Sequence, residues 1–208
     1  LGTAGQRGLS LVSVGGSMTA GGTTFDNPST QGLRVANSPG VTLVFGSTTV
    51  NDGGFNVGAT ATGIDLALGN AGASFTFANI VLTVDGGAGG FVANNSGTIN
   101  ILGPSAIHAN ASAGLDIVST SLGSGALFSS IVSVNSAGKG INLDNVSGSL
   151  TVNGGSITNP AGIAFDLNSG ASNVTYAGTV SKTSAGNLIE VTNRTGGTVT
   201  FSGNLSST

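Results

Sequence analysis

Residues 140–161 read GINLDNVSGSLTVNGGSITNPA, residues 162–185 read GIAFDLNSGASNVTYAGTVSKTSA, and residues 186–208 read GNLIEVTNRTGGTVTFSGNLSST. The three segments follow one pattern. Each begins with a glycine and an alternating apolar pair, passes through a polar turn to a second pair, and ends with a single apolar residue and a polar link. Short alternating runs bounded by turn residues are typical of β-strands. The pattern therefore predicts three short strands per segment, and repeated segments of this size favour the stacked coils of a solenoid.

The apolar residues of the pattern define the interior that we expect for each coil. Alternate residues of a strand face the same side, so the members of each pair should point inward together. The expected inward residues are Ile141/Leu143, Ile163/Phe165 and Ile189/Val191 in the first strand, Leu150/Val152, Val174/Tyr176 and Val199/Phe201 in the second, and Ile157, Val180 and Leu205 in the third.

The glycine-led opening recurs upstream, which extends the pattern over the whole chain. We therefore expect an all-β fold, a parallel β-helix of about eight coils with three short strands each, built as a single-stranded solenoid and forming one domain over residues 1–208. The handedness rule for parallel crossovers predicts a right-handed coil. Residues 52–62 lengthen one coil and are expected to form a looped-out corner. The coil openings are Gly8, Gly32, Gly63, Gly90, Gly114, Gly140, Gly162 and Gly186.

The second strand of each coil predicts a Ser/Thr face. Its template is an apolar residue, a threonine and another apolar residue, as in Leu150-Thr151-Val152, so the threonines should form an outward column. Asn100 and Phe128 are expected to interrupt this column. The threonines of the column are Thr42, Thr76, Thr151, Thr175 and Thr200.

Asparagine marks the links between coils, at Asn27, Asn135 and Asn159. Asparagine tolerates the left-handed backbone conformation and hydrogen-bonds to nearby backbone in turns. We therefore expect tight corners at these positions.

Composition excludes several classes of protein. Charged residues make up only 6% of the chain and the net charge is −3, so there is no basic patch for nucleic acid. The absence of cysteine excludes disulfides, thiol nucleophiles and cysteine-ligated zinc. No apolar run approaches the roughly 20 residues of a membrane helix. The 38% apolar content and its periodicity indicate a packed chain and not a flexible linker.

Two stretches, Gly148–Thr158 (GSLTVNGGSIT) and Thr192–Gly203 (TNRTGGTVTFSG), resemble the β-strand repeats of large bacterial secreted and surface proteins. This group includes autotransporter passenger regions and filamentous adhesins. The resemblance implies a right-handed β-helix displayed outside a bacterial cell as a stalk, adhesin or fibre. The resemblance carries over no catalytic residue. Because the sequence starts without Met and neither end resembles a charged cap, we also expect a fragment of a longer repetitive secreted protein.

Few residues offer chemistry. Asp144 and Asp166 occupy the same place in consecutive segments (INLD and IAFD), so they are predicted to lie about 4.8 Å apart. Such a pair would make a weak Ca²⁺ site, to which Asn145 and Asn168 would add oxygens, or else two exposed turn residues. Asp65, Asp116 and Glu190 are expected to share another outward column as solubilising charges. His108 is expected in an exposed link.

The expected function is a non-catalytic extracellular module, either a rigid stalk or a fibre subunit of a bacterial surface protein involved in adhesion. One alternative is a β-helix that binds or cleaves polysaccharide, which would need clustered carboxylates. A second is an ice-binding solenoid that uses the Ser/Thr face. Expected partners are other coils or domains of the parent chain, identical subunits end to end, and glycans or a host surface. No cofactor, nucleic acid or membrane insertion is expected.

Overall fold

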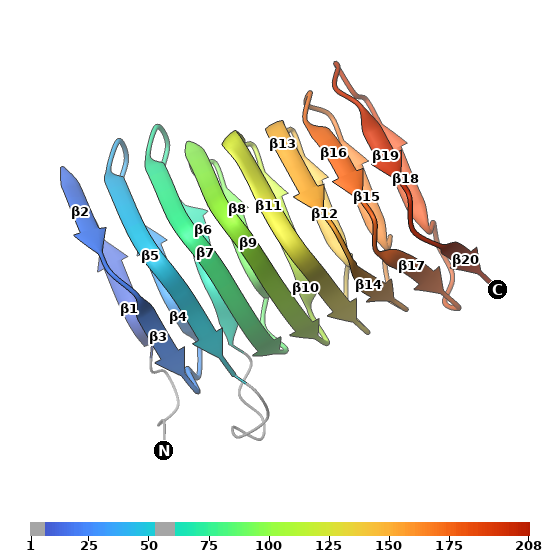
Figure 1. Cartoon of the computed structure of the whole chain (residues 1–208), viewed down its shortest axis with the longest axis horizontal. Helices are drawn as coiled ribbons and strands as arrows, with labels where there is room; N and C mark the ends of the chain where they lie inside the picture. The colour runs from blue at the N-terminus through green and yellow to red at the C-terminus, as the bar shows by residue number, and fades with distance from the viewer. Residues whose placement is uncertain (1–6, 53–60) are drawn as a thin grey trace.

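The computed structural model describes residues 7–52 and 61–208. In these residues the chain forms strands β1–β20 and no helix, and all strand pairs are parallel. The strands stack along one axis from the N-terminal to the C-terminal end (Figure 1). The predicted fold class, an all-β parallel β-helix, is confirmed. None of the described residues forms a helix capable of spanning a membrane.

Sheet A contains the first strand of every coil. Its eight members are hydrogen-bonded in chain order, so each coil lies directly on the one before it. They are β1 (Arg7–Val12), β4 (Gln31–Ala36), β6 (Thr62–Leu68), β8 (Gly89–Asn94), β10 (Ala113–Val118), β12 (Ile141–Asp144), β15 (Phe165–Asn168) and β18 (Ile189–Thr192).

Sheet B contains the remaining strands and differs along the chain. In four central coils the expected second and third strands form one long strand: β5 (Thr42–Asn51), β7 (Ser74–Asp85), β9 (Thr98–Asn110) and β11 (Ser121–Val134). In the other coils two short strands replace it. These are β2 (Ser17–Ala20) and β3 (Thr23–Asp26), β13 (Ser147–Val152) and β14 (Gly155–Thr158), β16 (Asn173–Tyr176) and β17 (Thr179–Lys182), and β19 (Val199–Phe201) and β20 (Leu205–Ser207).

The opening glycines are required by the close approach of the two sheets. A Cβ atom on Gly140 would lie 2.3 Å from the Cγ2 atom of Ile157, inside van der Waals contact. Gly90 and Gly114 face Ile107 and Ile131 in the same way, at 2.5 and 2.7 Å. Glycine therefore recurs at this position from the first to the sixth coil, because a side chain there would collide with neighbouring atoms of the stacked coils.

The predicted register of the seventh coil is wrong by two residues. Ile141 pairs with Phe165, and Phe165 pairs with Ile189, so the inward residues of β15 are Phe165 and Leu167. Ile163 lies before the strand. The place of Gly140 is taken by Ala164, which is fully buried. Gly162 and Gly186 consequently come two residues earlier in the chain than the position that the opening glycine occupies in the preceding coils.

The inward side chains form one core that runs the length of the described coils. Aromatic rings stack between coils and between sheets: Phe45 lies 5.2 Å from Phe77, and Phe165 lies 5.2 Å from Tyr176 and 5.0 Å from Phe201. Burial of a large apolar side chain stabilises a fold by roughly 1.5–3 kcal/mol, so this core is the main source of stability.

Single left-handed residues turn the chain at the end of each strand of sheet A. In the sixth coil this residue is Asn145, with φ of 53°, and its N–H donates to the carbonyl oxygen of Asn168 at 2.8 Å. The tight corners predicted at Asn27, Asn135 and Asn159 are confirmed, since all three have positive φ. The left-handed residues that end the strands of sheet A are Ser13, Asn37, Gly69, Asn95, Ser119, Asn145, Ser169 and Asn193.

The looped-out corner expected at residues 52–62 lies largely outside the described residues. At its borders, Asp52 is buried after β5, and Thr62 begins β6.

Candidate functional site on the outer face of sheet A

A column of polar side chains runs along the outer face of sheet A. Asp65 and Asp116 occupy the same register position in β6 and β10, with Val92 between them, as predicted. The column continues through Asn142 and Asp166 to Glu190. Neighbouring members belong to adjacent strands, which lie about 4.8 Å apart.

The predicted pairing of Asp144 with Asp166 is wrong. Asp144 pairs with Asn168, whereas Asp166 pairs with Asn142 and Glu190. The cause is the two-residue register error in the seventh coil, which had placed Asp166 beside Asp144. In residues 7–52 and 61–208, no group of three or more His, Cys, Asp or Glu residues is placed to hold a metal ion.

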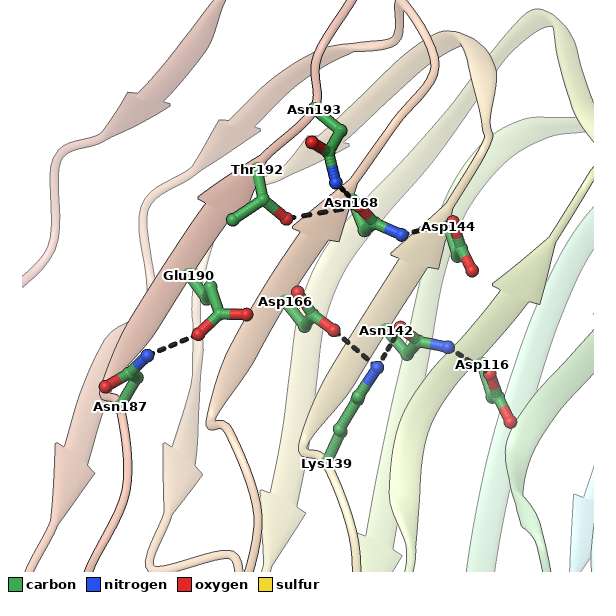
Figure 2. Close-up of polar contacts among 10 residues, drawn as sticks. All are labelled: Asp116, Lys139, Asn142, Asp144, Asp166, Asn168, Asn187, Glu190, Thr192 and Asn193. Atoms are coloured by element: carbon green, nitrogen blue, oxygen red, sulfur yellow. Dashed lines mark hydrogen bonds and ion pairs between the residues drawn. The ribbon is translucent and has the colours of Figure 1, made fainter.

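Lys139 ties the middle of this column together (Figure 2). Its Nζ atom forms an ion pair with Asp166 and donates a hydrogen bond to Oδ1 of Asn142 at 3.0 Å. The Nδ2 atom of Asn142 donates in turn to Oδ1 of Asp116 at 2.7 Å. These four residues, Asp116, Lys139, Asn142 and Asp166, are called the Lys139 network below. The network joins the strands β10, β12 and β15 of sheet A to Lys139, which lies in the link between β11 and β12.

Burial differs sharply within the Lys139 network. The side chain of Asp166 is 5% exposed, whereas that of Lys139 is 39% exposed. The Oδ1 atom of Asp166 is buried and has no hydrogen-bond partner among the described residues. Burying a charge without a partner is costly. The ammonium group of Lys139 therefore offsets the cost of burying the negative charge of Asp166.

A second polar group follows at the ends of the same strands (Figure 2). Asn168 donates from Nδ2 to Oδ1 of Asp144 at 2.9 Å, and its own Oδ1 accepts from Thr192 Oγ1 at 3.1 Å and from Asn193 Nδ2 at 3.0 Å. The side chains connect successive coils. Oδ1 of Asn168 is thus engaged within the protein, and one oxygen of Asp144 accepts from Asn168 instead of lying beside a carboxylate of Asp166.

A hollow of about 290 Å³ lies beside the Lys139 network. Three of the residues of the network line it, and the rest of its wall consists of small residues from three successive corners. We call it the sheet A hollow. It is lined by Gly87, Ala88, Ala111, Ser112, Ala113, Asp116, Ser136, Ala137, Gly138, Lys139 and Asn142.

The predicted Ser/Thr face is divided. Thr151, Thr175 and Thr200 form one run, as expected, but Leu127 precedes them and Phe128, which had been expected there, is buried. A register shift between Leu122 and Ala126 separates this run from the next.

The second run of the face contains fewer threonines than predicted. Val44 and not Thr42 stands next to Thr76, because Leu43 and Phe45 are the inward pair of β5. Asn100 follows, and its Oδ1 atom accepts hydrogen bonds from the N–H and Oγ of Ser124.

His108 lies exposed within β9 and pairs with Thr83 and Val132, so its expected place in a link is wrong. The third strand is longer in the central coils than the pattern indicated.

Sequence reasoning missed Lys182, whose side chain points into the protein from β17. Its Nζ atom donates to the carbonyl oxygens of Pro160 and Gly162 at 2.7 and 2.5 Å and to Oγ of Ser184 at 2.9 Å. The residue is 2% exposed. The available signal was the alternation with Val180, two residues earlier, which places Lys182 on the inward side.

Burial raises the pKa of two groups outside the column. For Asp52 the main cause is desolvation, opposed by backbone hydrogen bonds from Asp85 and Ala61 and reinforced by the charge of Asp85, so its pKa lies above the ordinary value. For Tyr176 desolvation alone raises the pKa of the hydroxyl, which has no hydrogen-bond partner among the described residues.

Comparisons with known protein families, with curated proteins and with solved structures find no match to this chain. The fold therefore rests on the structure itself, and the function on the physical properties of its surfaces.

Proposed function

We propose that this chain is a rigid, non-catalytic module of a bacterial extracellular surface protein, which spaces or presents other parts of that protein and contributes to adhesion. The unbroken hydrogen-bonded ladder of sheet A carries the proposal, because every strand of the sheet is joined to the next along the whole series of coils. Such a ladder transmits force through many backbone hydrogen bonds at once. The sequence resemblance to bacterial surface repeats is the reason for proposing an extracellular location.

The distribution of basic residues supports a role outside the cell, where proteases are abundant. The chain has only five Lys and Arg residues. Lys182 is buried, and Arg34, Lys139 and Arg194 are partly buried within strands or hydrogen-bonded corners. Cleavage at these positions requires local opening of the coil.

Limited proteolysis with trypsin tests the rigid-module proposal. In the unchanged folded chain, trypsin should make no cut on the C-terminal side of Arg34. The variant Gly140→Val, whose side chain pushes the corner beside Ile157 apart, should be cut rapidly at Lys139. Equal cutting of both proteins at Lys139 would contradict the proposal. The variant Gly138→Val is the matched control, because no atom lies within 4 Å of a Cβ atom at this position.

Two further measurements test location and catalysis. An antibody raised against the purified chain should label intact source cells, and labelling only after permeabilisation would overturn the extracellular assignment. Incubation with polygalacturonate, cellulose and peptidoglycan should release no reducing ends or unsaturated products. Release above that of a heat-denatured sample would show that the module is catalytic.

A further inference from the structure

The sheet A hollow lies beside a register position at which two successive coils carry small residues and the next coil carries a lysine. Ala113 pairs with Gly89, and the corresponding position of the following coil is Lys139, two residues before Ile141. The wall of the hollow includes the methyl group of Ala113 and the backbone of Gly87 and Gly138, together with Lys139. The recess lies directly beside Asp116, which also lines it.

The polar groups at this edge combine donors and acceptors in fixed positions. Lys139 uses its ammonium group for Asp166 and Asn142, and one of its three N–H bonds remains for a ligand. Asp116 accepts from Asn142 at Oδ1, which leaves its second carboxylate oxygen as an acceptor. Because Asn142 and the buried Asp166 hold both groups, the edge is preorganised for a ligand that accepts one hydrogen bond and donates another.

Charge and shape restrict the class of ligand. Two carboxylates and one ammonium give the Lys139 network a charge of −1, which disfavours phosphates and carboxylates. The ammonium already lies between the oxygens of Asp166 and Asn142, where a metal ion would be repelled. The lining residues include no aromatic ring on which a nucleobase would stack. Adjacent hydroxyl groups, each able to donate and accept, satisfy Asp116 and Lys139 together.

We propose that the sheet A hollow binds one sugar residue of an uncharged glycan, with a hydroxyl donating to Asp116 and an oxygen accepting from Lys139. Its volume of about 290 Å³ lies near the lower limit of roughly 300 Å³ for small-ligand pockets, which suits one ring and not a larger group. This goes beyond the structural role proposed above and does not depend on it.

The position of a second hollow indicates how the glycan lies on the protein. It has a volume of about 360 Å³ and lies at the other end of the same strands, β10 and β12, where Ser119 and Asn145 contribute to its wall. Asp116 and Ser119 are three residues apart, or about 10 Å along a strand. A glycan lying parallel to β10 and β12 reaches both hollows across the outer face of sheet A.

Titration of the ¹⁵N-labelled chain with uncharged hexasaccharides, followed by backbone amide chemical shifts, tests this site. The probes are cellohexaose, maltohexaose and chitohexaose, with hexagalacturonate as the charged arm and free glucose as the arm for a single sugar. At least one uncharged hexasaccharide should shift the amides of residues 87–88, 111–116 and 136–142, more strongly than glucose and hexagalacturonate do. Shifts with no uncharged probe, or only elsewhere, would overturn the proposal.

Two variants separate binding from folding. Asp116→Ala should lower the affinity for the hexasaccharide about tenfold or more, because a hydrogen bond to a charged group is lost. Ala113→Leu should also weaken binding, because it fills part of the hollow while leaving the four residues of the Lys139 network unsubstituted. Asp65→Ala is the matched control, since it removes a carboxylate of the same column outside the hollow. Equal weakening by Asp65→Ala, or unchanged affinity in a folded Ala113→Leu variant, would contradict the site. Trypsin resistance and cell labelling remain independent of these results.

Discussion

The outer faces of sheet A and sheet B are built on the same stacked backbone but carry different chemistry. On sheet A, Asp116, Asn142 and Asp166 are joined through Lys139 into one network. On sheet B, many outward residues are hydroxyl or apolar, such as Thr175 and the exposed Val44 and Leu102, and Asn100 and His108 stand among them. A parallel ladder brings identical positions of successive coils within about 5 Å, so charge repeated on one face must be compensated, whereas hydroxyl groups need no partner. The linked polar groups therefore lie on sheet A, whereas a hollow of about 460 Å³ on sheet B is lined by residues such as Leu102, Leu127 and Thr151.

The interior that the two faces share should give the largest effect. Phe165 on β15 of sheet A contacts Tyr176 and Phe201 of sheet B. Phe165→Ala should lower the free energy of unfolding by about 3–5 kcal/mol, because it leaves a cavity common to both sheets. Chemical denaturation measures this loss. Thr175→Ala, on the outer face of sheet B, should change the stability by less than about 0.5 kcal/mol. A similar loss for both variants would show that the faces are not independent of each other.

The corner where sheet A meets sheet B should give the next effect. Gly140→Ala should cost about 1–3 kcal/mol, since its Cβ would lie 2.3 Å from Ile157 and the core has to shift. Thermal unfolding of this variant should be compared with that of Gly138→Ala, which has open space around the Cβ position. Equal melting temperatures would mean that the sheets do not approach as closely as described.

The Lys139 network should contribute less than the core. Lys139→Met should lower the stability by about 1–2 kcal/mol, because it leaves the carboxylate of Asp166 buried without its counter-ion, although the lysine itself is partly exposed. The double variant Lys139→Met/Asp166→Asn should recover part of this loss. If the double variant is less stable than the single one, the ion pair is not the reason for the effect.

The smallest effect concerns Asp52, a carboxyl group at the end of β5 in sheet B. Desolvation raises its pKa in the folded chain, so folding favours the protonated form and stability from this group falls as the pH rises from the unfolded pKa through the folded one. Asp52→Asn should therefore raise stability slightly at pH 7, by less than about 1 kcal/mol, and leave it unchanged at pH 3. Denaturation at both pH values measures the difference. A gain of equal size at pH 3 would contradict the assignment to ionisation.

The number of coils could be predicted from the sequence. The registers of β15 and β5 could not, because at both strands three alternating residues are apolar. The opening glycines recur because only hydrogen fits beside Ile107, Ile131 and Ile157. In the seventh coil, however, residues 163, 165 and 167 are all apolar and alternate, so the pattern does not choose which pair enters the strand.

Residues 41, 43 and 45 present the same ambiguity, and all three are buried. This is why Thr42 was expected in the place of Val44. Only the pairing with neighbouring coils decides between such choices.

The candidate site was partly predictable. Period-two alternation placed Asp65, Asp116 and Glu190 in one column, and the structure confirms this placement. Lys139 was not assigned because it lies in a link whose path depends on the left-handed corner at Asn135. The small residues of the sheet A hollow carry no sequence signal of their own, since alanine and glycine are frequent throughout this chain.

The offset between the sixth and seventh coils has a consequence for how such a molecule can change its length. Ile141 pairs with Phe165 and Leu150 with Val174, so the first and second strands of these two coils are shifted by the same number of residues in both sheets. The third strands are shifted by one residue less, since Ile157 pairs with Val180. Excision of one such unit from the gene rejoins the chain in phase, with every inward residue still facing inward. A deletion or duplication of one such unit would therefore shorten or lengthen the protein by one coil and leave the inward-facing residues of these strands in register.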